Sequence, residues 1–119
     1  MTAVRWPAEW EPHAATWLAW PHNSETWPGR LVEAQLEFAD FVRELSLREP
    51  VRILVGDAAM RETARHGIRA AGADGERVSF PMIETDDAWL RDTGPVFVLR
   101  GGNRTLIDFQ FDSWGGKYP

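Results

Sequence analysis

The chain has 119 residues, a formal net charge of −5 and no cysteine. A chain of this length fits one domain, and we expect residues 1–119 to form a single one. Without cysteine, the chain cannot contain a disulfide, a thiolate metal site or a cysteine nucleophile. The acidic charge argues against a nucleic-acid partner, because no basic stripe is present to neutralise phosphates.

The sequence also argues against a membrane partner. Its apolar runs are only a few residues long, and the first residues, Met-Thr-Ala-Val-Arg-Trp-Pro, contain no apolar segment of the kind found in signal peptides. We therefore expect a cytoplasmic protein. The three histidines show no metal-ligand spacing, so no metal and no cofactor is expected, and His66 should lie on the surface.

The first half of the chain predicts a strand and a long helix. Residues 15–20, Ala-Thr-Trp-Leu-Ala-Trp, are typical of a short strand, which Pro21 ends. A helix of about twenty residues is expected from near Pro28 to Leu47, because apolar residues recur at helical spacing and proline suits a first helical position. Most of the seven tryptophans are expected to fill the core.

A βαβ unit with a right-handed crossover is predicted next. Residues 51–55, Val-Arg-Ile-Leu-Val, form a nearly continuous apolar run, as a strand buried on both faces requires. Asp57 is a plausible N-cap for a helix that reaches about Ala71. Residues 78–83 predict a second strand, in which Pro81 indicates an edge position or a bulge.

The last third of the chain predicts a β-hairpin and a glycine-rich segment. Residues 96–99 and 104–109 flank Gly101-Gly-Asn103, a sequence typical of a hairpin turn. Residues 113–119, Ser-Trp-Gly-Gly-Lys-Tyr-Pro, follow the hairpin. Their glycines either allow the backbone to approach a ligand closely or simply turn the chain.

The most informative segment is residues 84–95, Glu-Thr-Asp-Asp-Ala-Trp-Leu-Arg-Asp-Thr-Gly-Pro, which we call the acidic motif. It combines four carboxylates with an indole and a guanidinium: Glu84, Asp86, Asp87, Asp92, Trp89 and Arg91. If residues 89–92 form one helical turn, Trp89 and Asp92 project from the same side. An indole face beside a carboxylate would suit a planar cation such as a guanidinium.

Each residue of the acidic motif also has a structural interpretation. Asp92 is either a guanidinium ligand or a turn or N-cap aspartate, and Trp89 either lines a pocket or fills the core. Asp86 and Asp87 are either solvated loop acids or contributors to the field of a pocket. Arg91 is expected to pair with a neighbouring acid, because two cations in one pocket would repel each other.

Four segments together resemble one family in the same order along the chain. They are Trp6-Pro-Ala-Glu-Trp-Glu-Pro-His13, Thr16-Trp-Leu-Ala-Trp-Pro21, Asp86-Asp-Ala-Trp-Leu-Arg-Asp-Thr-Gly-Pro95 and Phe109-Gln-Phe-Asp-Ser-Trp-Gly-Gly-Lys-Tyr118. The chain resembles the N-terminal part of the agmatine deiminases and bacterial-type peptidyl-arginine deiminases, over essentially its whole length.

The resemblance implies an α/β-propeller (pentein) fold built of ββαβ repeats, of which this chain would form about one repeat and the start of the next. It implies a small cationic guanidinium substrate. The reaction would convert agmatine to N-carbamoylputrescine and ammonia, a step of putrescine biosynthesis, or arginine residues to citrulline. Asp92 and Trp89 would bind the guanidinium, with Asp86 and Trp114 as further substrate-binding candidates.

The catalytic part of the family's site is not matched in this chain. The family's nucleophilic cysteine and its His-x-Asp/Glu motif lie further towards the C-terminus, and His13, His22 and His66 match neither. A guanidinium is a poor electrophile that needs a thiolate, so we expect the isolated chain to be an inactive, truncated product. It could instead be a cation-binding module, or a structural domain that associates with another chain. Exposed propeller edges would favour self-association.

Overall fold

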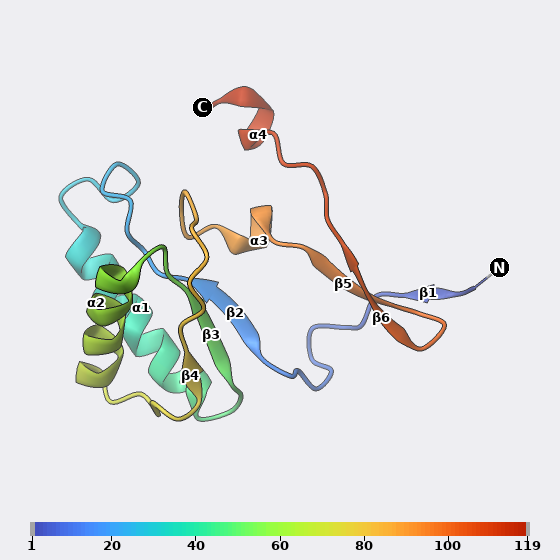
Figure 1. Cartoon of the computed structure of the whole chain (residues 1–119), viewed down its shortest axis with the longest axis horizontal. Helices are drawn as coiled ribbons and strands as arrows, with labels where there is room; N and C mark the ends of the chain where they lie inside the picture. The colour runs from blue at the N-terminus through green and yellow to red at the C-terminus, as the bar shows by residue number, and fades with distance from the viewer. Residues whose placement is uncertain (1, 119) are drawn as a thin grey trace. The chain divides into compact units, whose positions relative to one another are not determined.

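The computed structural model describes residues 2–118 of the chain. They form two compact units (Figure 1). Residues 13–88 make up the parallel-sheet unit, and residues 2–12 together with 89–118 make up the antiparallel-sheet unit. The single domain expected from the chain length stays a prediction. Within residues 2–118, no helix is long and apolar enough to cross a membrane.

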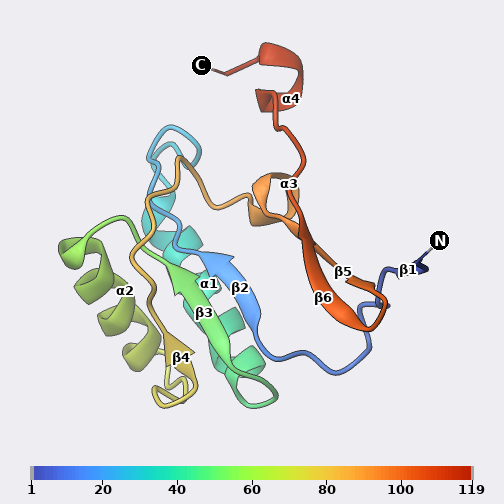
Figure 2. The ribbon, with the colours of Figure 1, turned by 45° about the vertical axis from the view of Figure 1, so that its right-hand side comes forward.

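The parallel-sheet unit is a β-α-β-α-β arrangement. Its elements are β2 (Thr16–Ala19), α1 (Leu31–Ser46), β3 (Val51–Leu54), α2 (Ala58–Ala70) and β4 (Val78–Ser79). The strands form a parallel sheet in the order β2-β3-β4, so each helix connects two neighbouring strands. Helices α1 and α2 pack against each other on one side of this sheet (Figures 1 and 2).

The core of this unit lies between the two helices and the sheet. Val42 from α1 and Ala64 from α2 are fully buried against Ile53 of β3, and Trp20 packs edge-to-face on Phe38 with ring centroids 5.4 Å apart. These residues fall at helical spacing in α1 and α2 and at alternate positions in β3, so burial follows the apolar pattern of the sequence.

Both helices lie close to where the sequence predicts them. The Asp57 carboxylate accepts a hydrogen bond from the Met60 backbone N–H at 2.7 Å, which confirms the predicted N-cap of α2. Helix α1 begins at Leu31 rather than at Pro28, so the predicted start is wrong by three residues. Gly29 has a φ of +68°, and a residue in the left-handed region cannot continue a right-handed helix.

The predicted strand at 78–83 is interrupted. Strand β4 ends at Ser79, and pairing with β3 resumes only at an isolated bridge between Val55 and Met82. Pro81 lies in the gap, where its carbonyl accepts from Val55 N at 3.2 Å although it has no N–H to donate. Since β4 is an edge strand, the predicted edge position of Pro81 is confirmed.

The predicted burial of β3 on both faces holds except at one position, since Leu54 is buried on the second face and Arg52 beside it is not. Arg52 is exposed, and its guanidinium lies 5.0 Å from the centre of the Trp17 ring on the neighbouring strand β2. The two residues are register partners, so they project from the same face of the sheet. The helices cover the opposite face, and within residues 13–88 the Trp17 face carries no second layer of helices.

Most tryptophans lie outside the core, which corrects another prediction. Trp20 alone among the seven is buried, with 2% of its surface exposed, and Trp27 is half-buried. The other five are exposed: Trp6, Trp10, Trp17, Trp89 and Trp114. Four of them belong to the antiparallel-sheet unit, whose short elements enclose little apolar volume.

The antiparallel-sheet unit is a three-stranded sheet flanked by two single turns. Its elements are β1 (Val4–Arg5), α3 (Leu90–Thr93), β5 (Val96–Arg100), β6 (Asn103–Ile107) and α4 (Ser113–Gly116). The order β1-β5-β6 confirms the predicted hairpin and adds β1, which the sequence did not indicate. Gly101 and Gly102, with φ of +57° and +82°, form the hairpin turn.

Candidate functional site

The acidic motif ends in one helical turn, close to the turn predicted for residues 89–92. Trp89 is the N-cap of α3, with φ −80° and ψ 59°, so it precedes the helix instead of forming its first residue. Its carbonyl accepts from the backbone N–H groups of Asp92 and Thr93, each at 3.1 Å. The Thr93 hydroxyl donates to the same carbonyl at 3.1 Å. Asp92 and Thr93 therefore donate three hydrogen bonds to the Trp89 carbonyl.

Gly94 closes this turn by a close backbone approach. Its N–H donates to the Leu90 carbonyl oxygen at 2.8 Å. A Cβ atom at position 94 would lie only 2.6 Å from that same oxygen. The glycine of the acidic motif is thus required for space, because its φ of −79° and ψ of 156° are open to any residue.

The turn places a carboxylate and an indole at the surface of the antiparallel-sheet unit. Asp92 is exposed, and within residues 2–118 its carboxylate has no hydrogen-bond or ion-pair partner. The Trp89 side chain is 42% exposed, which argues against its role as core filler. Because Trp89 is the N-cap, Asp92 is not, and its N-cap interpretation is wrong. The Asp92 carboxylate can therefore accept hydrogen bonds from a cation.

Glu9, which lies outside the acidic motif, neutralises the positive charge of Arg91. Arg91 Nη1 lies 2.6 Å from Glu9 Oε1, in an ion pair whose side chains are 84% and 75% exposed. The expected pairing of Arg91 with an acid is confirmed, although the partner comes from a distant part of the sequence and not from the acidic motif. With Arg91 occupied by Glu9, the negative charge of Asp92 is not cancelled within its own turn.

The other acids of the acidic motif belong to the parallel-sheet unit, and they differ in the hydrogen bonds that their carboxylates accept. Asp87 accepts a hydrogen bond from the Thr26 hydroxyl and another, at 2.7 Å, from the Ala88 backbone N–H. Asp87 therefore links the loop between Trp20 and α1 to the acidic motif through a hydrogen bond. Asp86 is exposed and, within the described residues, its carboxylate has no such partner. Asp86 is free to bind a cation, and Asp87 is not.

The segment around Trp114 adopts a conformation that the sequence did not predict. Ser113 and Trp114 both have a φ of +55°, and the next two residues, Gly115 and Gly116, have φ of +80° and +72°. Gly116 N donates to the Asp112 carbonyl at 2.7 Å. Helix α4 is thus a single left-handed turn, which costs roughly 1–2 kcal/mol at each non-glycine residue. Gly115 and Gly116 adopt their positive φ without this cost, because glycine has no Cβ.

Side chains hold this strained turn. The Asp112 carboxylate accepts from Gly115 N at 2.9 Å. The Trp114 ring meets Phe111 edge-to-face at 4.9 Å between centroids and Tyr118 at 5.8 Å. Trp114 remains 44% exposed. Trp114 is therefore a partly exposed indole with two aromatic neighbours, in the same unit as Trp89 and Asp92.

The histidines have local roles in the parallel-sheet unit. His13 Nδ1 lies 3.0 Å from Glu49 Oε2, and His22 Nδ1 lies 3.0 Å from the Trp20 carbonyl oxygen. His66 is exposed, as predicted. Across residues 2–118, no group of three or more His, Cys, Asp or Glu side chains is placed to hold a metal ion.

Glu11 accepts hydrogen bonds that organise the first of the four family-like segments. One carboxylate oxygen accepts from Arg5 Nη1 at 2.6 Å and from the Ala8 backbone N–H at 2.8 Å. The hydrogen bond from Arg5, followed by the one from Ala8, lowers the pKa of Glu11 below its ordinary value. This small motif organises the start of the antiparallel-sheet unit and lies apart from the acidic motif in sequence.

Comparison with known proteins identifies the family. The family model for the Porphyromonas-type peptidyl-arginine deiminases matches residues 5–119. The chain belongs to this family. It is 40% identical over 111 residues to the agmatine deiminase of Ectopseudomonas mendocina, covering 92% of this chain and 28% of that protein. It is 39% identical over 113 residues to the agmatine deiminase of Pseudomonas aeruginosa, covering 94% of this chain and 29% of that protein.

A solved structure supports the fold. A variant of the C. jejuni agmatine deiminase with substrate bound matches 99% of this chain and 33% of its own, with a TM-score of 0.83 and 24% sequence identity. The mixed α/β class predicted from the sequence is confirmed, and so is the predicted family. The chain spans under a third of the length of the curated relatives named above.

Proposed function

We propose that this chain is the N-terminal portion of a guanidinium hydrolase that converts agmatine and water to N-carbamoylputrescine and ammonia. The observation that carries the proposal is the α3 turn, on which an exposed Asp92 carboxylate follows an exposed Trp89 indole. Its support is membership of the deiminase family and 40% identity to a protein named agmatine deiminase.

In this proposal Asp92 binds and orients the substrate. A guanidinium presents pairs of N–H donors in one plane, and a carboxylate can accept two of them in charge-assisted hydrogen bonds. The Trp89 residue is 42% exposed, and its indole would contact the same planar cation, an interaction of about 0.5–2 kcal/mol depending on how far water is excluded. Neither group transfers a proton. Trp114, held by Phe111 and Tyr118, is a second candidate for contact with the substrate, and Asp86 is a further one from the sequence.

The chemical step needs a group that the chain does not have. A resonance-stabilised guanidinium requires a strong nucleophile, and a thiolate is the side chain that combines nucleophilicity with an accessible anionic form near neutral pH. The sequence contains no cysteine. The nucleophile would therefore come from residues beyond these 119, and we expect the 119-residue chain to release no ammonia from agmatine.

The exposed surfaces of both units agree with a larger propeller. Parallel sheets are normally covered on both faces, yet helices cover only one face of β2-β3-β4 within residues 13–88. Strand β6 is an edge strand that carries the exposed Leu106. We propose that both units belong to one cytoplasmic domain, which further ββαβ repeats complete. Without those repeats the chain should self-associate as its concentration rises.

Binding can be tested without turnover. We would titrate the chain, at a concentration where it is monomeric, with agmatine and follow the indole N–H signals by NMR. Putrescine, which carries an ammonium in place of the guanidinium, is the matched ligand control. Agmatine should shift the Trp89 signal more than putrescine does, and Asp92→Asn should weaken agmatine binding by about tenfold or more.

Asp108→Asn is the matched variant, because it removes one exposed carboxylate from the same unit without touching α3. Equal weakening by both variants, or an equal response to agmatine and putrescine, would contradict the proposed role of Asp92. Ammonia release by the re-purified chain would contradict the cysteine requirement. A continuation of the reading frame that encodes a His-x-Asp/Glu motif and a late cysteine would support the N-terminal assignment.

A peptidyl-arginine substrate is the second candidate. It is favoured by the family whose model matches residues 5–119, which is named for peptidyl-arginine deiminases. The same titration with an N-acyl-arginine amide separates the two candidates. A stronger Trp89 response to that compound than to agmatine would favour the peptidyl substrate.

A further inference from the structure

The parallel-sheet unit contains a pocket that is cationic and separate from the acidic motif. Its volume is about 560 Å³, within the range of small-molecule sites. Helix α2 and the segment that follows it form the walls. The lining residues are Arg61, Arg65, Ile68, Arg69, Ala73, Gly75, Val78 and Phe80.

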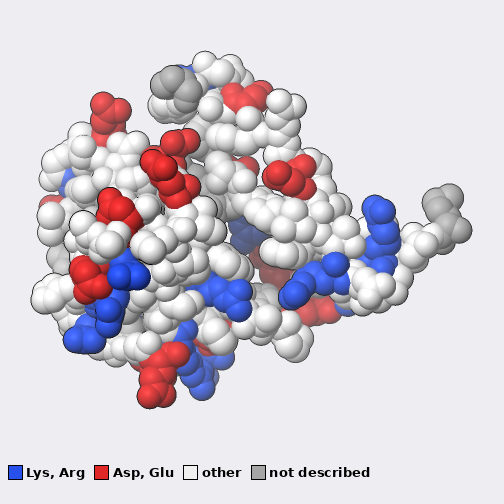
Figure 3. Space-filling view, in the orientation of Figure 1, with Lys and Arg blue, Asp and Glu red and all other residues white. Residues whose placement is uncertain are grey.

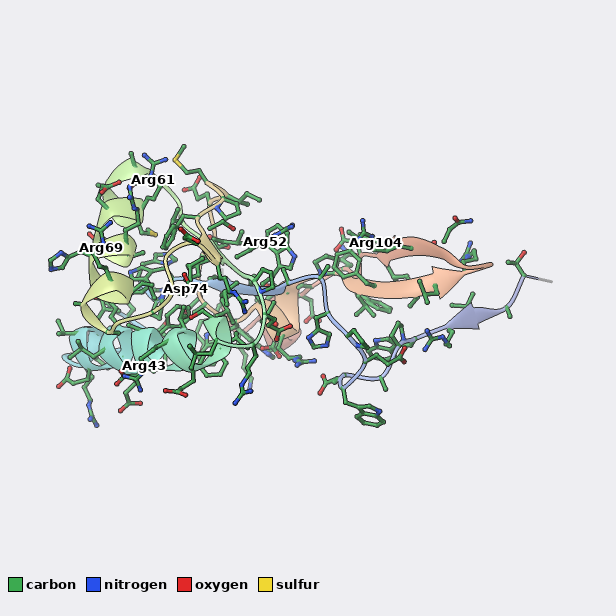
Figure 4. All side chains as sticks on the ribbon, turned by 90° about the horizontal axis from the view of Figure 1, so that it is seen from below. Arg43, Arg52, Arg61, Arg69, Asp74 and Arg104 are labelled. Carbon is green, nitrogen blue, oxygen red and sulfur yellow. The ribbon has the colours of Figure 1, made fainter. Side chains whose placement is uncertain are left out.

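Three arginines line this pocket at a spacing of four residues along α2, at positions 61, 65 and 69. Like charges at this spacing face one another on a helix and destabilise it by about 0.2–0.5 kcal/mol per pair. Figure 3 shows the resulting group of cationic atoms over α2. Arg61 and Arg69 extend from this helix in Figure 4. In a chain of net charge −5, such a concentration of positive charge is a local feature.

The charge of these arginines is only partly neutralised. One oxygen of Glu62 lies 3.3 Å from Arg65 Nη1 and 3.7 Å from Arg61 Nε. Arg69 has no ion-pair partner among residues 2–118. A single carboxylate therefore contacts two of the three guanidinium groups, and the pocket keeps an excess of positive charge.

One donor is enclosed without a hydrogen-bond acceptor. Arg61 Nε is buried and, within the described residues, makes no hydrogen bond, because Glu62 is too far away at 3.7 Å. A buried charged donor without an acceptor costs more than an exposed one, since it has lost its water. The Arg61 and Arg65 side chains are otherwise 38% and 48% exposed, so these two arginines stay accessible to an anionic ligand from solvent.

The remaining walls are apolar. Ile68 is 3% exposed and Val78 is 8% exposed, and Phe80 is half-buried beside them. Ile68 and Val78 are thus already shielded from water, and the apolar surface left open to a ligand belongs to Ala73 and Phe80. A ligand with an apolar body would cover them while its oxygens meet the guanidinium groups.

We propose that this pocket binds a small organic anion, whose carboxylate or phosphate oxygens contact the arginines of α2 and whose apolar body packs on Ala73 and Phe80. Guanidinium groups bind both oxyanions through paired N–H donors. The site is independent of the proposed deiminase function, since it shares no residue with the acidic motif or with α4.

The test is a titration of the 119-residue chain with benzoate and, separately, with phenyl phosphate, followed through the α2 amide and arginine Nε–H signals by NMR. Acetate tests the apolar wall, and benzamidine presents the same ring with the opposite charge. We expect saturable binding of benzoate, phenyl phosphate or both, with acetate at least about tenfold weaker and benzamidine without effect on α2. The tighter of the two aromatic anions identifies the preferred oxyanion.

Variants test the arginines directly. Arg69→Gln should weaken binding by about tenfold, and Arg65→Gln serves as a second variant if the first loses the α2 signals. Arg43→Gln is the matched control, because Arg43 pairs with Asp40 and Glu44 on α1 and does not line the pocket. The proposal is overturned if neither aromatic anion binds below about 10 mM, if benzamidine binds equally well, or if Arg43→Gln weakens binding as much as the pocket variants do.

Discussion

The substitution Gly94→Ala tests whether the α3 turn depends on a close backbone approach. Its added Cβ would lie 2.6 Å from the Leu90 carbonyl oxygen and 3.6 Å from the Leu90 carbonyl carbon. The conformation at position 94 is open to alanine, so the effect comes from this contact alone. Because the obstructing atom belongs to the backbone, no side-chain rotation relieves the clash.

The free-energy cost of Gly94→Ala depends on moving the added Cβ and the Leu90 carbonyl oxygen apart. The oxygen that the Cβ would strike also accepts the Gly94 N–H at 2.8 Å, so separating the two atoms weakens that hydrogen bond. Loss of one such bond together with local overpacking costs about 1–3 kcal/mol. The open form of the turn should then be favoured by about 5- to 100-fold relative to the parent chain.

Hydrogen exchange measures this population. We expect the amide at position 94 and the amides of Asp92 and Thr93 to exchange faster by about that factor, with a displaced Trp89 indole signal and weaker agmatine binding. Gly75→Ala is the control, since a Cβ there has no atom within 4 Å and the φ is not positive. The control should change exchange in α3 by less than about twofold.

Unchanged exchange at position 94 in Gly94→Ala would refute the close-approach explanation. Equal acceleration in both variants would show that the effect is a general loss of stability. Intact exchange rates combined with lost agmatine binding would show that position 94 contacts the ligand instead of shaping the turn.

Three further outcomes follow from the contacts described above. Ile53→Ala, at a fully buried position, should lower the free energy of unfolding by about 2–5 kcal/mol in urea denaturation. Asp57→Ala removes the acceptor of the Met60 N–H and should cost about 0.5–2 kcal/mol, with faster amide exchange in the first turn of α2. Glu11 should titrate below its ordinary pKa by NMR, and Arg5→Gln should raise that pKa. Its contribution to stability is present above the unfolded-state pKa and is lost as pH falls through the folded-state pKa.

Features controlled by nearby residues were predictable from the sequence. The cap at Asp57, the hairpin turn at Gly101-Gly102 and the edge position of Pro81 each depend on a few adjacent residues. The start of α1 was not predicted, although it is also local. Pro28 suits a first helical position, but the positive φ of Gly29 moves the start to Leu31. A proline signal and a glycine signal competed there, and the glycine determined the boundary.

Features that depend on distant pairing were missed. Strand β1 exists because Val4 pairs with Arg100, and no pattern in two residues could indicate it. The predicted burial of the tryptophans was wrong for the same reason, because the number of tryptophans in a sequence does not indicate which unit encloses each ring. At the candidate site, the pairing of Arg91 with an acid followed from charge alone. Its partner, Glu9, could not be identified, because it lies 82 residues away in the sequence.

Each indole of the proposed guanidinium site stands on a tight backbone turn. Trp89 is held by three hydrogen bonds to its carbonyl, in a turn that Gly94 allows to close. Trp114 lies in a left-handed turn that Gly115 and its neighbour continue. Strain of this kind persists only where the surroundings compensate for it, and it clusters at binding sites. Both turns position an aromatic ring and supply no nucleophile, so in the proposed function they would hold the guanidinium while the bond-breaking group comes from another part of the protein.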